Sequence, residues 1–259
     1  MRFGICTDSA NAGVVKRLGY DFIELGISEL VPEGPESEFA PVRDRILQST
    51  LQAEALNKFI PKGIMLVGPQ PDTARAQHFV EVALSRAAEI GARVIVWGSP
   101  HARQVPEGFS KERALEQLAE IARYMGKTAA QYGQLIVVEP LDAATTNTIW
   151  TVQDGYDLAV QVGHPSVQTM ADIYQMAKNS EPLEQMAVAG SYLGHVHVSD
   201  PDRQPPANPE HYGFYRNAFS ILKKMGYDGR VSIEARVSDF EHQAARGLAV
   251  LRETLAEAL

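Results

Sequence analysis

The sequence predicts an α/β protein that folds as a single (β/α)8 barrel, the TIM-barrel architecture, over residues 1–259. Eight short apolar or β-branched runs recur along the chain, each about as long as a strand. Stretches with helical spacing lie between them, and several end at a glycine, the residue favoured just after a last helical turn. Eight such units in 259 residues match the number and the size of a closed parallel barrel.

The elements follow in order along the chain. The predicted strands are Phe3–Thr7, Phe22–Leu25, Leu56–Ile60, Val94–Trp97, Leu135–Glu139, Val167–Ile173, Leu193–Val198 and Val231–Ala235. The clearest predicted helices are Thr73–Ile90, Lys111–Tyr132, Thr151–Val162, Phe219–Met225 and Phe240–Leu259. The Pro- and Glu-rich segments Val31–Pro41 and Asp200–Tyr212 are expected as long loops. A doubly wound open sheet is the rival fold, but Cys6–Ala10 lacks the glycine-rich phosphate turn expected after its first strand.

Composition and charge exclude several classes of protein. The 24 Lys and Arg against 32 Asp and Glu give a net charge of −8, which repels nucleic acid and anionic lipid. The single cysteine, Cys6, excludes an internal disulfide framework, and MRFGICTDSA lacks the pattern of a secretory signal. The longest apolar runs are too short to cross a bilayer. We therefore expect a cytoplasmic protein that binds neither nucleic acid nor membrane, and whose assembly into a homo-oligomer is open.

Four potential metal ligands each end one of the last four predicted strands. They are Glu139 in LIVVEPL, Asp172 in VQTMADIYQ, His197 in LGHVHVSD and Glu234 in RVSIEAR. A carboxylate at the end of a buried strand costs free energy unless an ion or a proton neutralises it, so four in succession indicate one shared ion. This mainly oxygen set favours Mn²⁺, with Mg²⁺, Co²⁺ or Zn²⁺ as alternatives. His195 shares a strand face with His197 one layer deeper, where it would shape the pocket from the barrel core.

At these residues the chain resembles the xylose isomerase-like sugar epimerases and isomerases, a family that includes the ketose 3-epimerases and hydroxypyruvate isomerase. The resemblance covers nearly the whole chain. It rests on NKFIP at Asn57–Pro61, VEPL at Val138–Leu141, ADIY at Ala171–Tyr174, GHVHVSDPDR at Gly194–Arg203 and GYDGRVSIE at Gly226–Glu234. These segments are weak singly and fairly specific in this order and spacing.

The resemblance implies a reaction and roles for the four ligands. Family members bind one divalent metal through the residues that match Glu139, Asp172, His197 and Glu234, and the arginine that matches Arg203 contacts substrate. The implied reaction is proton transfer at the carbon next to a ketone, through a metal-stabilised enediolate. Glu139 and Glu234 would be the catalytic pair, one removing the proton and the other returning one to the opposite face. The substrate would be a small carbohydrate.

Two positions depart from the family pattern. Family epimerases often carry a glutamate where this chain has Thr145, and a histidine where it has Gln175. Both family residues contact the sugar, so we expect Thr145 and Gln175 to contact a different one. A lyase, such as a dehydratase or decarboxylase of a keto-sugar or keto-sugar acid, is the alternative because it would use the same enediolate. A metal-dependent AP endonuclease-like repair enzyme is a weaker alternative, because 7 histidines and the acidic charge fit it poorly.

Further candidates for substrate binding come from the predicted rim. His101 and Arg103 lie in the loop after the fourth strand, and Asn57 lies in the third strand. Trp150 offers a flat apolar ring that could pack on the C–H groups of a sugar. We expect these side chains to line the pocket around the metal site.

Overall fold

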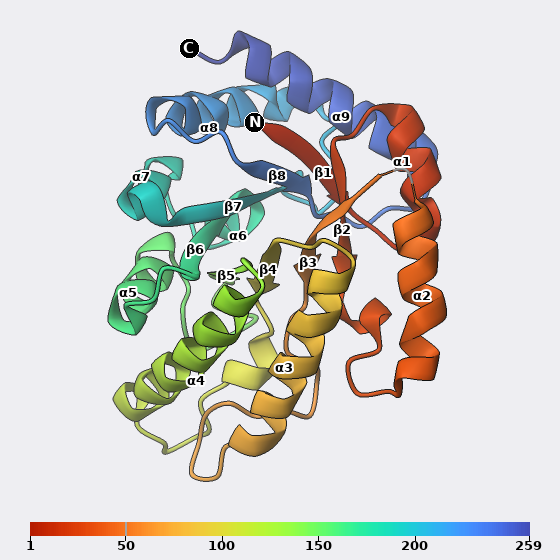
Figure 1. Ribbon diagram of the computed structural model, residues 1–259. Coiled ribbons are helices and arrows are strands. Elements are labelled where there is room, and N and C mark those ends of the chain that lie inside the picture. Colours follow the sequence, from red (N-terminus) through yellow and green to blue (C-terminus); the bar gives the residue numbers. More distant parts are fainter. Residues whose placement is uncertain (50) are drawn as a thin grey trace.

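The computed structural model describes residues 1–49 and 51–259, and it confirms the (β/α)8 barrel (Figure 1). The strands are β1 Arg2–Cys6, β2 Phe22–Gly26, β3 Ala53–Asn57, β4 Val94–Trp97, β5 Leu135–Val138, β6 Val167–Asp172, β7 Leu193–Val198 and β8 Arg230–Ile233. Each strand pairs in parallel with the next, and β8 pairs with β1 to close the barrel. Their carboxyl ends therefore meet at one rim.

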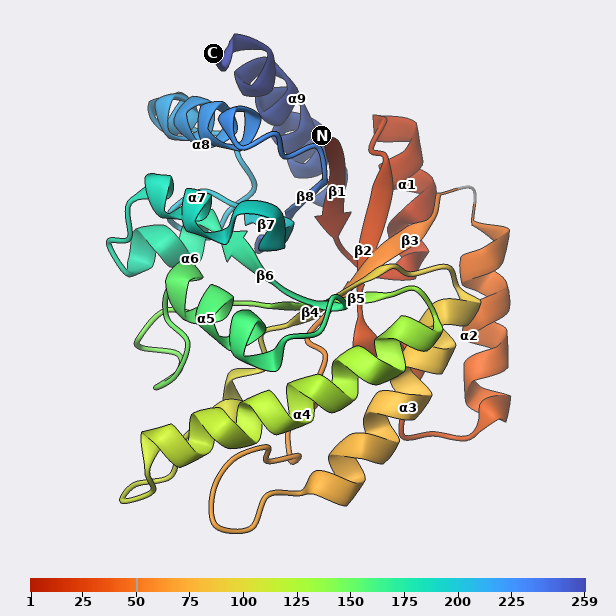
Figure 2. The same ribbon diagram turned by 60° about the vertical axis from the view of Figure 1, so that its left-hand side comes forward.

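Helices surround the barrel (Figures 1 and 2), and both termini lie near the last two of them. The α-helices are α1 Ala12–Leu18, α2 Glu36–Gln48, α3 Thr73–Glu89, α4 Lys111–Gln131, α5 Val152–Val162, α6 Ile173–Lys178, α7 Met186–Ala189, α8 Tyr212–Lys224 and α9 Phe240–Glu257. Short 3-10 helices are η1 Ser9–Asn11, η2 Ile27–Leu30, η3 Pro100–Arg103, η4 Leu183–Gln185, η5 Gly190–Tyr192 and η6 Pro209–His211. Within the described part of the chain, every helix is too short or too polar to span a bilayer.

The structure corrects several predicted boundaries. The third strand ends at Asn57, because the left-handed backbone of Lys58 (φ 55°) turns the chain out of the sheet. The segment expected as a loop up to Pro41 is helical from Glu36 onward, and only Phe39 and Ile46 of α2 are buried. Such a sparse apolar stripe gives a weak periodic signal. The seven-residue α1 is likewise absent from the prediction, and α8 begins at Tyr212 rather than Phe219.

Apolar side chains fill the lower interior of the barrel and leave its upper end polar. The interior cluster consists of Phe22, Ala55, Val94, Val96, Val137 and Met170. Gly4 makes room for this layer, because a Cβ there would lie 2.3 Å from the Phe22 ring. Alternate residues of a strand share a face, so Glu24 points into the barrel one layer above Phe22. The carboxylates and histidines of the upper layers thus lie on an apolar floor.

Candidate active site

The four predicted ligands come together at the carboxyl rim of β5 to β8. One ligand atom each from Glu139, Asp172, His197 and Glu234 lies within 4.8 Å of the other three. Backbone pairing places two of them, because Glu139 N donates to Trp97 O at 3.2 Å and Glu234 N donates to Val198 O at 3.1 Å. The Asp172 side chain also caps α6, accepting from Tyr174 N at 2.9 Å. These bonds fix the backbones of Glu139 and Glu234 at the rim and orient the Asp172 carboxylate.

His197 lies in the middle of this cluster and presents one ring nitrogen to it. Its Nδ1 atom lies 3.5 Å from Glu139 Oε1 and 3.2 Å from Glu234 Oε2, and it makes no hydrogen bond among the described residues. Its Nε2 atom lies 2.9 Å from Glu24 Oε1. A proton on Nε2 leaves the Nδ1 lone pair facing the carboxylates, which is the arrangement of a metal-ligating histidine. The donor set therefore fits a divalent cation.

Glu24 is the buried partner that sequence reasoning missed. Its carboxylate is fully buried, and its other oxygen lies 2.9 Å from Nε2 of His195. The two imidazoles, 5.0 Å apart between ring centroids, thus share one carboxylate. The signal was present in the sequence, because Glu24 interrupts the apolar run Phe22–Leu25 at a position that faces the barrel interior. A second possible ligand group, with Cys6 and His197, also includes Glu24, whose two oxygens already bind the histidines.

Burial and neighbouring charges shift the pKa values of Glu139, Glu234 and His197. Burial raises the pKa of the Glu139 carboxyl. Burial acts in the same direction on Glu234, but the neighbouring His197 and Arg203 outweigh it and lower its pKa. Burial would lower the pKa of His197, but Glu24 and Glu234 hold it well above its usual value. Negative charge is thus in excess around the imidazole, and a bound cation would relieve that excess.

Arg203 ion-pairs with two of the four ligands. Its guanidinium donates to Asp172 Oδ2 at 2.8 Å and to the Glu234 carboxylate. The group also lies over the ring of Tyr174, 4.4 Å from its centroid. Arg203 occupies a tight turn after β7, where its own backbone is left-handed (φ 64°). The Arg203 side chain lines the cavity above the cluster, which is a suitable position for the predicted contact with substrate. The contact itself remains a prediction.

A cavity of 400 Å³ opens above the cluster, within the range of small-ligand sites. Its lining includes Cys6, Asn57, Lys58, Asp142, Thr145, Tyr174, Gln175, Arg203 and Glu234. Asp142 forms hydrogen bonds with Thr145 and Gln175, the two residues that depart from the family pattern. Thr145 Oγ1 donates to Asp142 Oδ2 at 2.7 Å, and the Asp142 backbone N donates to Gln175 Oε1 at 2.9 Å. We call this space the catalytic cavity.

The structure places the remaining predicted residues elsewhere. Trp150 lines a separate surface cavity, where Lys111 Nζ lies 5.1 Å from its ring centroid. Arg103 is fully buried and donates to the backbone carbonyls of Trp97 and Glu139, at 3.4 and 2.5 Å. His101 lines a neighbouring cavity, described below. Of the predicted substrate contacts, the lining of the catalytic cavity thus includes Asn57, Thr145, Gln175 and Arg203.

Enzymes with a parallel eight-stranded barrel carry their active sites at the carboxyl ends of the strands. The carboxylate–imidazole cluster of this barrel lies at that end, so the architecture is that of an enzyme. The chain belongs to the family described as the xylose isomerase-like TIM barrel, whose sequence profile matches residues 13–254. The fold class and the family expected from the sequence are both confirmed.

Curated relatives of this chain are sugar epimerases. D-psicose 3-epimerase of Ruminiclostridium cellulolyticum is 25% identical over 232 residues, which are 85% of this chain and 75% of the relative. The 3-dehydro-D-guloside 4-epimerase of Escherichia coli K12 is 28% identical over 232 residues, or 86% of this chain and 85% of the relative. Epimerases are isomerases, which is the enzyme class that the sequence predicts.

Solved structures share the whole architecture. D-psicose 3-epimerase with D-tagatose from Clostridium cellulolyticum H10 has a TM-score of 0.85 at 21% identity, covering 98% of this chain and 99% of that chain. An AP endonuclease of family 2 from Brucella melitensis has a TM-score of 0.76 at 20% identity, with 98% and 99% covered. At these identities the likeness shows the fold alone.

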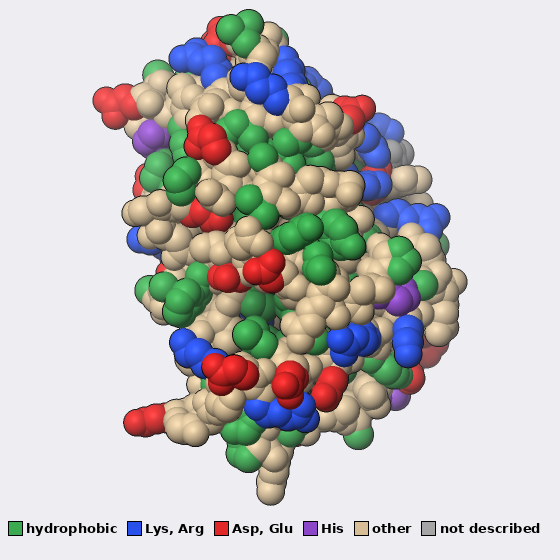
Figure 3. Space-filling view, turned by 90° about the vertical axis from the view of Figure 1, so that its left-hand side faces the viewer, with side chains coloured by type: hydrophobic (Ala, Val, Ile, Leu, Met, Phe, Trp, Pro, Cys, Tyr) green, Lys and Arg blue, Asp and Glu red, His purple; other side chains and the backbone are tan. Residues whose placement is uncertain are grey.

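The charged side chains of one face are mixed in sign. On the face shown in Figure 3, Lys and Arg side chains lie in separate groups with Asp and Glu between them.

Proposed function

We propose that this chain is a divalent-metal-dependent sugar epimerase that transfers a proton at the carbon next to a ketone. One observation carries the proposal: Glu139 and Glu234 face His197 Nδ1 from β5 and β8, at 3.5 and 3.2 Å, beneath a cavity of sugar-binding size. The named relatives are sugar epimerases, which supports this choice among the reactions that the fold allows.

Glu139, Asp172, His197 and Glu234 would hold the cation, and the oxygen-rich set favours Mn²⁺, with Mg²⁺, Co²⁺ or Zn²⁺ as alternatives. When bound there, a divalent cation would supply the positive charge that makes an enediolate accessible. Arg203 pairs with both Asp172 and Glu234, but only Asp172 also accepts the cap hydrogen bond of α6, so it is the ligand least available for proton transfer. That leaves the two glutamates to move protons.

The two glutamates approach His197 from the ends of different strands, β5 and β8. That arrangement suits them to exchange protons with different faces of one substrate carbon. In one direction, Glu234 takes the proton of the C–H bond, and the bonding pair moves into the enediolate. Glu139 then delivers a proton to the opposite face of the same carbon, so that atoms and charge balance and the configuration inverts.

Glu139→Gln and Glu234→Gln should each abolish turnover while leaving the fold intact. A side-chain amide neither takes up nor releases a proton near neutral pH. The loss of general acid–base catalysis alone lowers the rate by about 10²–10⁴-fold. Exchange of the carbon-bound hydrogen with solvent deuterium, followed by NMR on a panel of ketoses and keto-sugars, measures this step directly. Glu116→Gln, an exposed helix position, is the matched control. Full activity of either cavity variant would refute the mechanism.

A lyase is the second candidate because of Asp142. This carboxylate lines the catalytic cavity and binds Thr145, at the place where the family pattern expects a sugar-binding glutamate. A carboxylate there could assist the departure of a hydroxyl group from the enediolate. Both enzymes would exchange deuterium, but only a lyase would release water or a carbon fragment. Mass spectrometry of the products separates the two.

A further inference from the structure

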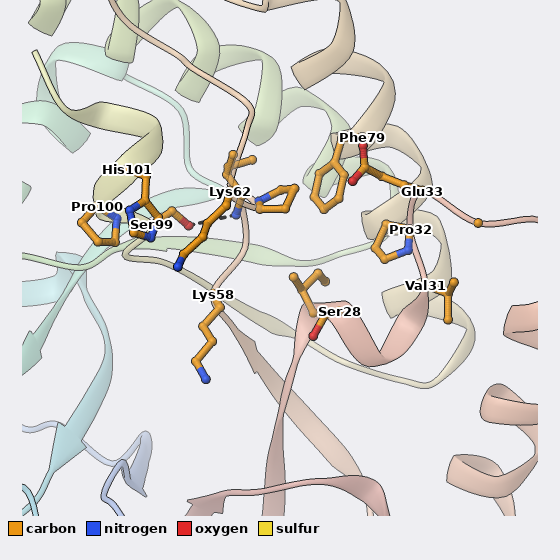
Figure 4. Close-up of a pocket in the computed structure, with 14 residues that line it drawn as sticks. Ser28, Val31, Pro32, Glu33, Lys58, Lys62, Phe79, Ser99, Pro100 and His101 are labelled. Carbon is orange, nitrogen blue, oxygen red and sulfur yellow. Dashed lines mark hydrogen bonds between the residues drawn. The ribbon is translucent and has the colours of Figure 1, made fainter. Parts of the chain in front are cut away.

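A second cavity of 470 Å³ adjoins the catalytic cavity at the carboxyl ends of β2, β3 and β4 (Figure 4). Ser28 and Lys58 line both cavities and therefore mark the boundary between them. Each cavity alone falls within the ~300–1,000 Å³ of small-ligand sites. A free monosaccharide bound over the metal ligands would leave the second cavity without an occupant.

The lining of the second cavity is mainly apolar. Ile27, Val31, Pro32, Ile60 and Phe79 contribute to its wall. In Figure 4, Lys62 lies near Ser99 and His101, while Phe79 and Pro32 lie on the other side together with Glu33, whose carboxylate is ion-paired with Arg75. A sugar hydroxyl that lost its water here without a partner would cost several kcal/mol, on the order of 2–7. The cavity therefore suits an apolar group better than a second sugar ring.

Left-handed backbone concentrates around this cavity. Val31 (φ 49°), Lys58 (φ 55°) and Ser99 (φ 39°) all line it, and they are half of the six non-glycine residues with positive φ among those described. A β-branched residue such as Val31 is rare in this region of backbone space. Such strain persists where the surroundings over-determine it, and it clusters at ligand sites.

Arg86 of α3 supplies that constraint for the wall formed by the loop after β2. Its guanidinium donates to Leu30 O at 3.1 Å, to Gly34 O at 2.9 Å and to Val31 O. On the facing wall, Ser99 Oγ accepts from the backbone N of Ile60 at 2.9 Å. Both walls are thus fixed by buried hydrogen bonds before any ligand arrives, which lowers the entropy cost of binding.

We propose that the second cavity binds the apolar aglycone of a keto-glycoside whose sugar ring lies in the catalytic cavity. The inference rests on the proposed function, because it names the substrate class of that same site. Lys58, at the boundary, would donate to the oxygen that joins sugar and aglycone. We call the second cavity the aglycone cavity.

Binding of unreactive glucosides tests the aglycone cavity without catalysis. Isothermal titration of the metal-loaded protein with methyl and phenyl β-D-glucoside should show the phenyl compound binding about 10- to 100-fold more tightly, as burial of one apolar ring predicts. Pro61→Trp, which fills the aglycone cavity only, should remove this difference. Gln70→Trp, an exposed position on the same loop, should keep it. Equal affinities in the unmodified protein would overturn the proposal.

Turnover of the 3-keto derivatives separates this inference from the proposed function. Deuterium exchange should favour the phenyl over the methyl keto-glycoside by a similar factor, and Pro61→Trp should reduce only the phenyl rate. Failure of every keto-sugar to exchange would sink the epimerase proposal, while the titration would still decide on the cavity. A free ketose turned over faster than both keto-glycosides, with no phenyl preference in binding, would refute the aglycone cavity and leave the epimerase standing.

Discussion

Single residues set the protonation of the imidazole at the centre of the site. Glu24 has two carboxylate oxygens, and each lies 2.9 Å from the Nε2 atom of one histidine. In Glu24→Gln only one acceptor oxygen remains, so one histidine loses its partner or changes tautomer. For His197 that change would place a proton on Nδ1, where the metal should bind. We expect a 10- to 100-fold loss of Mn²⁺ affinity, measured by titration of the metal-free protein. Glu33→Gln, at an exposed glutamate, is the control, and unchanged affinity in Glu24→Gln would show that Glu24 does not orient the ligand.

The absence of one side chain also shapes the site. A Cβ at Gly98 would lie 2.1 Å from Glu139 Oε2, so Gly98→Ala must displace the end of that flexible carboxylate. Because a displacement of about 1 Å can cost about 10²-fold in rate, we expect kcat to fall by that factor while thermal stability changes little. Gly13→Ala, an exposed helix position with nothing within 4 Å of the new Cβ, should keep full activity and gain up to about 1 kcal/mol of stability. Wild-type kcat in Gly98→Ala would show that the position of Glu139 tolerates this shift.

The grouping of Glu139, Asp172, His197 and Glu234 could be predicted from sequence because each lies at the end of a strand, and strand ends of a barrel share one rim. The residues that surround this group could not be predicted in the same way. Glu24 and His197 are 173 positions apart, and their pairing depends on the barrel closing. Arg103 follows a strand as a substrate contact would, yet its guanidinium turns inward to backbone carbonyls. Position along the chain predicts which rim a residue reaches, but not which way its side chain points.

At the scale of elements, regular strands and long amphipathic helices were predictable, and strained connections were not. The bounds of β4 and β7 match their apolar runs, whereas β3 ends early because Lys58 adopts a left-handed backbone that no propensity for lysine indicates. The helix α2 was hidden by its polar composition and by Pro41 within it. The missed helices α1 and α2 bury few apolar side chains, so the periodic signal that would reveal them in the sequence is weak.

The hydrogen bonds from α3 to the loop after β2 predict how that loop depends on Arg86. Arg86→Met would leave the buried carbonyl of Leu30 and the half-buried carbonyls of Val31 and Gly34 without this donor. We expect a loss of roughly 2–4 kcal/mol in the free energy of unfolding, measured by urea denaturation. Arg93→Met, which removes one exposed bond to Tyr132 O, should cost less than about 1 kcal/mol. Equal losses in the two variants would mean that burial of the Arg86 contacts does not matter.

At the scale of the whole molecule, the barrel brings the carboxylates of Glu24, Glu139, Asp172 and Glu234 together around His195 and His197, and Arg203 ion-pairs with two of them. Binding of a divalent cation to the folded state alone would therefore stabilise the barrel by linkage, by about 2.7 kcal/mol at 100 times the Kd. For a domain of this size, we expect Mn²⁺ to raise Tm by roughly 5–10 °C and EDTA to reverse the rise, as measured by calorimetry. A protein that carries both Glu139→Gln and Glu234→Gln should fold and show no such shift, because two of its four ligands have lost their charge. If Mn²⁺, Mg²⁺, Co²⁺ and Zn²⁺ all left the unmodified Tm unchanged, the excess negative charge of the barrel would have to be neutralised by protons and Arg203 instead, and the metal-dependent mechanism would fall with it.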